Sequence, residues 1–120
     1  MRAVIADPSV AGNLRIAEVA DPTPDSTEVL IRVSAFPVNR GEVKRAEVAP
    51  TGQAIGRDTL GVAERAARDG SGPPAGTRVV GFSKRMQGWA ERVALATRDR
   101  AAVASALIDR DYPGKAVLTL

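Results

Sequence analysis

The chain has 120 residues and a net charge of +3, with 17 Lys and Arg, 14 Asp and Glu, and neither cysteine nor histidine. This composition excludes disulfide bonds, zinc sites built from cysteine or histidine, and acid–base catalysis by histidine. Basic and acidic residues are interleaved, which is typical of a solvated surface rather than a nucleic-acid-binding patch, and no apolar stretch is long enough to span a membrane.

Short apolar runs separated by Gly and Pro predict a mainly β fold. Aromatic residues make up only 3% of the chain, so its core must consist of small branched side chains, which pack well in strands. The strongest signal is the Val- and Ile-rich run at residues 28–35, which Pro37 ends. Gly61 lies inside another apolar run, where a glycine often marks a bulge or a close approach of two backbones. In chain order, the predicted strands are 2–6, 14–19, 28–35, 59–67, 78–82, 90–96 and 115–120.

Two segments have helical signals. Asn39 can cap a short helix that runs through residue 47 and is rich in Glu, Lys and Arg. Residues 98–109 are rich in alanine and predict a second helix. Many short strands with one or two helices indicate a small barrel or sandwich. Because no repeat or long linker interrupts the chain, residues 1–120 are predicted to form one domain.

Four segments together form a specific pattern: VLIRVSAFPVNRGEV at 29–43, GRDTLGVAE at 56–64, GTRVVGF at 76–82 and GWAERV at 88–93. In this order and spacing, they resemble the GroES-like catalytic domain of the medium-chain dehydrogenase/reductase superfamily. The resemblance covers residues 1–97 and is to the zinc-independent quinone oxidoreductase branch, whose members use NADPH. It implies a partly open β-barrel with short helices.

The end of the chain resembles the strand with which full-length family members return to this domain after their Rossmann domain. Here the two parts, 1–97 and about 105–120, are almost adjacent, so the resemblance implies that the nucleotide-binding domain between them is missing. The glycine-rich residues 70–76 contain two prolines, which lack N–H donors for a phosphate, and no helical pattern follows them. We therefore expect no bound cofactor and no competent dehydrogenase from this chain alone.

The resemblance also points to residues of the catalytic cleft. Zinc-dependent relatives hold the metal with a cysteine and a histidine at the positions of Asn39 and Arg57, and neither residue can replace these ligands, so no zinc is expected. Asn39, Arg57 and Asp58 are the candidate catalytic residues, and Asn39, Arg40 and Trp89 are the candidate substrate-binding residues. Simpler explanations are a helix cap for Asn39, a loop ion pair for Arg57 and Asp58, and a core position for Trp89.

Three functions are compatible with these features. The first is a substrate-binding domain that binds a small apolar carbonyl compound without turnover. The second is a cofactor-free cyclase or isomerase with a deep pocket beside Asn39, in which Asn39 and Arg57 polarise a carbonyl and Asp58 is the base. The third is a module that forms a homodimer through the surface that the Rossmann domain covers in relatives. We expect no nucleic acid or membrane as partner, and a cytoplasmic location because residues 1–5 lack signal-peptide features.

Overall fold

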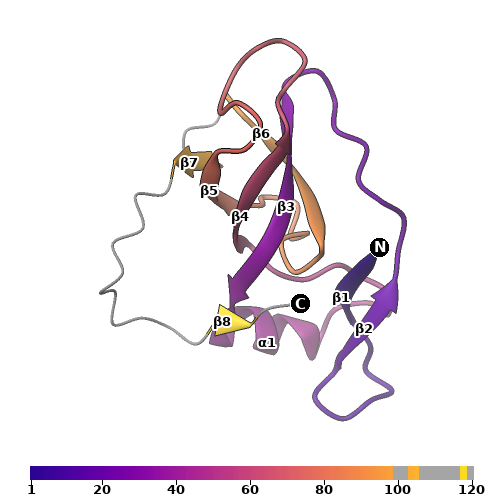
Figure 1. The fold of residues 1–120 in the computed structure, drawn as a ribbon. Helices are drawn as coiled ribbons and strands as arrows, with labels where there is room; N and C mark the ends of the chain where they lie inside the picture. The colour runs from indigo at the N-terminus through magenta and orange to yellow at the C-terminus, as the bar shows by residue number, and fades with distance from the viewer. Residues whose placement is uncertain (99–102, 106–116, 119–120) are drawn as a thin grey trace.

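The computed structural model describes residues 1–98, 103–105 and 117–118 of the chain. These residues form eight short β-strands and one short α-helix (Figure 1). Among them, no helix has the length and the apolar character needed to cross a membrane. In chain order, the elements are β1 (Arg2–Ala6), β2 (Leu14–Glu18), β3 (Glu28–Pro37), α1 (Arg40–Ala46), β4 (Asp58–Arg65), β5 (Arg78–Phe82), β6 (Arg92–Ala96), β7 (Val103–Ser105) and β8 (Val117–Leu118).

The strands form two antiparallel sheets. β1 and β2 form a two-stranded sheet, and the remaining strands form a six-stranded sheet in the order β6-β3-β4-β5-β7, with β8 also paired to β3. The path of the larger sheet is open within the described residues, because β6 and β7 lie at its two ends. The prediction of a mainly β fold is therefore confirmed, while the described strands do not close into a complete ring.

The long strand β3 is the centre of the molecule. It pairs with β6 along its first half, with β4 along its middle and with β8 at its end. Its inward side chains include Val29 and Ile31, both fully buried, whereas Arg32 and Ser34 are exposed. Near its end, the ring of Phe36 stacks on that of Trp89 with the ring centroids 5.2 Å apart. This stack is part of the apolar core between the sheet and α1.

Gly61 allows β4 to approach β3 very closely. A Cβ atom at this position would lie 2.2 Å from the carbonyl oxygen of Arg32, a distance at which atoms overlap. The pairing of the two strands also shifts register between Val33 and Ala35. The expected bulge and close backbone approach at Gly61 are therefore confirmed.

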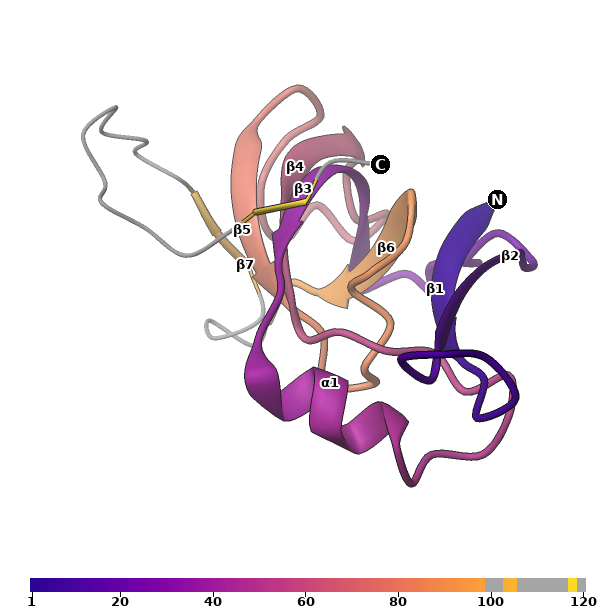
Figure 2. The ribbon, with the colours of Figure 1, turned by 90° about the horizontal axis from the view of Figure 1, so that it is seen from below.

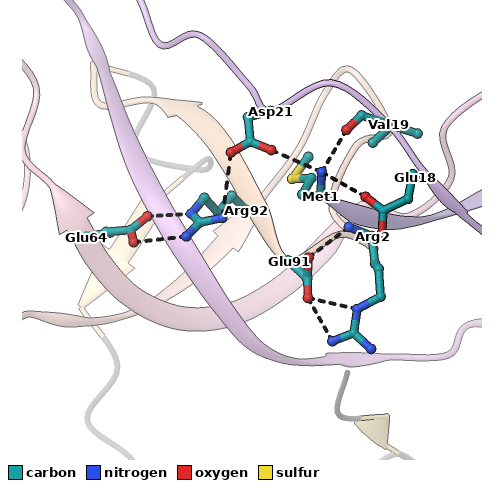
Figure 3. Close-up of polar contacts among 8 residues, drawn as sticks. All are labelled: Met1, Arg2, Glu18, Val19, Asp21, Glu64, Glu91 and Arg92. Atoms are coloured by element: carbon teal, nitrogen blue, oxygen red, sulfur yellow. Dashed lines mark hydrogen bonds and ion pairs between the residues drawn. The ribbon is translucent and has the colours of Figure 1, made fainter.

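The β1–β2 hairpin stands beside the start of β6 (Figure 2). The Val4 N–H donates to the carbonyl of Trp89 at 2.8 Å, and the Glu91 N–H donates to the carbonyl of Arg2 at 3.0 Å. The side chains of Arg2 and Glu91 also form an ion pair at 2.7 Å (Figure 3). These contacts join the small sheet to the large one.

The end of the chain corrects one prediction and supports another. The predicted helix at 98–109 is wrong at Val103–Ser105, which forms β7 and pairs with β5. Alanine has a high helix propensity, but propensity is a weak determinant that tertiary contacts override, and here pairing with the outer edge of β5 satisfies the backbone of this segment. In the predicted final strand, Val117–Leu118 pairs with β3. The rest of these two predictions, on residues 99–102, 106–109, 115–116 and 119–120, lies outside the described part of the chain.

Candidate functional site

Three predicted site residues come together where β3 ends, α1 begins and β4 starts. Asn39 directly precedes α1, and Asp58 is the first residue of β4. Because β3 and β4 are neighbours in the sheet, the two side chains meet, and Asn39 Nδ2 donates a hydrogen bond to Asp58 Oδ2 at 2.9 Å. Arg57 precedes Asp58 and therefore lies at the same place.

The side chain of Asn39 does not cap the helix. Asn39 occupies the N-cap position with an extended backbone (φ −100°, ψ 140°), but its side chain makes no capping hydrogen bond. Its amide instead donates to Asp58 and, at 3.3 Å, to Oε1 of Glu42 in the first turn of α1. A capping role therefore explains the backbone conformation of Asn39 but not the contacts of its side chain, whose amide binds two carboxylates.

Glu42 connects the helix to the segment before β4. Its side chain is buried, with 6% of the residue exposed, and Oε1 also accepts a hydrogen bond of 3.4 Å from the backbone N–H of Arg57. A carboxylate in the first helical turn is favoured by the helix dipole. We call Asn39, Glu42, Arg57 and Asp58 the Asn39 cluster.

The Arg57 side chain contacts Met86 and Phe82. Its Nε donates to Met86 Sδ at 3.0 Å, and Cζ lies 6.0 Å from the centroid of the Phe82 ring. Arg57 is exposed, and among the described residues no carboxylate lies within ion-pair distance of its guanidinium. The two residues therefore have separate partners, which differs from the loop ion pair considered above.

Met86 lies in a tight turn after β5. Its φ is +59°, a left-handed conformation that is uncommon for residues other than glycine. Ser83 stabilises the turn, because its carbonyl accepts the Met86 N–H at 3.1 Å and its Oγ accepts the Gln87 N–H at 3.1 Å. The turn places the Met86 thioether against Arg57, and the residue is only 8% exposed.

A small cavity of about 170 Å³ opens beside the Asn39 cluster, lined by Gly41, Glu42, Arg45, Arg57 and Met86. Small-molecule sites usually enclose ~300–1,000 Å³, so this cavity can hold only one end of a ligand. Two arginines line it, and a guanidinium is a permanently charged donor to a carbonyl oxygen or an oxyanion. Within the described residues, no group of three or more acidic, His or Cys side chains is placed to hold a metal ion.

The structure separates the other two predicted site residues from this cavity. Arg40 is the first residue of α1 and is exposed, and Trp89 is 2% exposed in the core. Sequence reasoning did not single out Glu42 or Met86. Glu42 carries a signal, because an acidic residue three positions after an N-cap is part of a known helix-start pattern. Met86 carries none, because its role depends on a turn that only the fold reveals.

No profile of a known protein family and no curated protein sequence matches the chain. Solved structures do match. The human synaptic vesicle membrane protein VAT-1 homolog-like protein is 27% identical, with a TM-score of 0.74, over 88% of this chain and 34% of that one. The quinone oxidoreductase of Coxiella burnetii is 20% identical, with a TM-score of 0.72, over 89% and 37%. The Escherichia coli quinone oxidoreductase complexed with NADPH is 17% identical, with a TM-score of 0.71, over 91% and 35%.

These 120 residues thus span about a third of the length of the structures that they match. The predicted resemblance to the GroES-like domain of medium-chain quinone oxidoreductases is confirmed. The two quinone oxidoreductases, at 20% and 17% identity, establish the fold and leave the chemistry to be argued from this chain's own residues.

Proposed function

We propose that this chain is the substrate-binding domain of a quinone-oxidoreductase-like protein and that it holds a small apolar carbonyl compound against Arg57. On this proposal it supplies the substrate side of the reaction and does not transfer hydride by itself. The observation that carries the proposal is the position of the Arg57 guanidinium, which is exposed at a small cavity and has no ion-pair partner among the described residues.

The contacts of Arg57 suit it to this role. Its Nε donates to the Met86 sulfur, which is only a weak acceptor. A guanidinium has five N–H donors, so the other four can donate to a carbonyl oxygen. The Phe82 ring lies within the distance of a cation–π contact and limits the positions that the side chain can take. A preoriented cation of this kind stabilises negative charge that develops on a carbonyl oxygen.

The size of the cavity favours a shared site. With about 170 Å³, it has room for the carbonyl end of a ligand and leaves the apolar body to a second surface. In an oxidoreductase, the second surface would be that of a nucleotide-binding domain, which also brings the hydride. The sequence contains no Gly-x-Gly-x-x-Gly motif for a dinucleotide, so on this proposal the hydride comes from elsewhere.

Cyclohex-2-en-1-one is a suitable probe, and amide chemical shifts of the ¹⁵N-labelled chain provide the readout. We expect saturable shifts at Gly41, Arg57 and Met86 in the millimolar range, and weaker ones with cyclohexene, which lacks the carbonyl. Arg57→Gln should weaken binding by about three- to tenfold, because it removes a charged donor. Arg78→Gln is the matched control. It changes an exposed arginine, the first residue of β5, and should have no effect on binding. Equal binding by wild type and Arg57→Gln would contradict the proposal.

The cofactor-free isomerase remains the second candidate, with less support. Its base would be Asp58, whose Oδ2 already accepts a hydrogen bond from Asn39, and the cavity beside Arg57 is too small to enclose a substrate alone. Conversion of cyclohex-3-en-1-one to the conjugated enone without cofactor would favour this candidate, provided that Asp58→Asn abolishes the conversion. We expect no conversion above the rate in buffer.

A further inference from the structure

A second and larger cavity, of about 400 Å³, lies between the β1–β2 hairpin, β6 and the segment that follows β2. We call it the hairpin cavity. No residue of the Asn39 cluster lines it. Its volume lies in the range of small-molecule sites. Residues of β1 and β6 line it, and these two strands lie near each other in Figure 2.

Apolar side chains form about half of the wall of the hairpin cavity. Among the lining residues, Ile55 and Val93 are buried, and Val4, Val19 and Ala54 are half-buried. Trp89 also lines it, stacked on Phe36. Removing apolar surface from water gains about 25 cal/mol per Å², so an apolar ligand is favoured over water here.

Three charged side chains line the hairpin cavity. Among its lining side chains, two are cationic, Arg85 and Arg92, and one is anionic, Asp21. The Asp21 carboxylate is already compensated by the Met1 ammonium at 3.1 Å and by Arg92 at 3.7 Å (Figure 3). Arg92 is in turn held by Glu64 at 2.8 Å.

Arg85 has unused capacity. Its Nη2 pairs with Oε1 of Glu28, a carboxylate whose side chain is 4% exposed, while the Arg85 side chain itself is 61% exposed. A guanidinium has five N–H donors, and this contact uses only part of them. Arg85 is therefore anchored by one contact and can still bind an acceptor at the edge of the hairpin cavity.

From this arrangement we infer that the hairpin cavity binds a small amphiphilic carboxylate, with its apolar part against Ile55 and Val93 and its carboxylate at Arg85. A molecule of the size of decanoate, with twelve non-hydrogen atoms, fits the volume. The inference is independent of the proposed carbonyl site, because the two cavities share no residue.

Trp89 provides the measurement, because it is the only tryptophan of the chain and lines the cavity. Decanoate is titrated into the protein below its micelle-forming concentration, and the tryptophan emission is recorded. We expect a saturable change, and binding at least about fivefold weaker for decyltrimethylammonium, which has the same chain and the opposite charge. Equal affinity for the two probes, or no saturable change with decanoate, would overturn the inference.

Three variants locate the site. Ala54→Phe fills the cavity and should weaken decanoate binding at least about tenfold. Arg85→Gln combined with Glu28→Gln removes the anchor without leaving a buried carboxylate unpaired, and should abolish the preference for the anion. Arg78→Gln, on β5, is the control and should bind like wild type. Circular dichroism checks that each variant is folded. Wild-type affinity in folded Ala54→Phe would place decanoate elsewhere and contradict the inference.

Discussion

The backbone of Gly56 lies directly against the indole of Trp89, so that a Cβ atom at position 56 would be 2.1 Å from Cδ1 of the ring. Gly56 also has a φ of +102°, which side-chain-bearing residues rarely adopt. This contact fixes the position of the loop that leads into Arg57 and Asp58. It thereby connects the core stack of Trp89 and Phe36 to the candidate site.

Gly56→Ala should therefore destabilise the fold by about 2–4 kcal/mol, the sum of overpacking against Trp89 and of the strained backbone. Gly52→Ala is a matched control, because Gly52 has a similar φ of +88° but open space where its Cβ would be. Urea unfolding of both variants separates the two effects. If Gly56→Ala costs no more stability than Gly52→Ala, the indole contact has no structural importance.

Asn39 should be needed to hold two carboxylates together. Asn39→Asp would place a third carboxylate beside those of Glu42 and Asp58. The pKa of the introduced carboxyl group would be raised, because nearby like charges disfavour its ionised form. A raised carboxyl pKa makes the fold lose stability as the pH rises, so the variant should be destabilised more at pH 7 than at pH 4. Asn39→Ala, measured by the same urea unfolding at both pH values, removes the donor without adding charge. Equal effects of the two variants at pH 7 would contradict this account.

Acid should weaken the hairpin through Asp7. Hydrogen bonds from Ser9 and from Arg15 lower the pKa of Asp7 below its ordinary value of 3.8. The stabilisation from a lowered carboxyl pKa is present above the ordinary value and is lost as the pH falls through the lowered one. Asp7→Asn should thus reduce stability at pH 6 but cause a smaller difference at pH 2.5. A pH-independent difference between wild type and variant in urea unfolding would show that Asp7 acts without its charge.

Self-association is the expected behaviour of the isolated chain. Large apolar side chains are exposed, among them Val48, two residues after the end of α1, at 84%, and Ile16 on β2, at 59%. We expect a homodimer in the micromolar range, formed through the side of α1, since burying such side chains is favourable. Val48→Lys should weaken it and Ile16→Lys should not. Sedimentation equilibrium at several concentrations measures this, and a constant monomer mass would contradict the expectation.

Local sequence patterns predict most of the sheet. The run at 28–35 is rich in branched residues, which makes β3 evident, and the place of Gly61 inside an apolar run indicates the close approach of β4 and β3. The helix after Asn39 is also evident from its charges and its start signal. The fold departs from these patterns where pairing is nonlocal, as for Val103–Ser105, whose strand conformation depends on the free edge of β5.

The candidate site is only half predictable from the sequence. Asn39, Arg57 and Asp58 are identified through their resemblance to family positions, and the fold brings them together. Glu42 and Met86 complete the arrangement through contacts that span 15 and 29 positions of the chain. Contacts of this kind arise from the packing of α1 and of the turn after β5, which no local pattern encodes.

Calorimetric titration of the chain with NADPH tests the central claim most directly, namely that these residues supply the substrate side of an oxidoreductase and not its nucleotide site. We predict no binding at micromolar concentrations, with a dissociation constant weaker than about 10 μM, or ~−7 kcal/mol. A tighter dissociation constant, or consumption of NADPH when cyclohex-2-en-1-one is added, would contradict it.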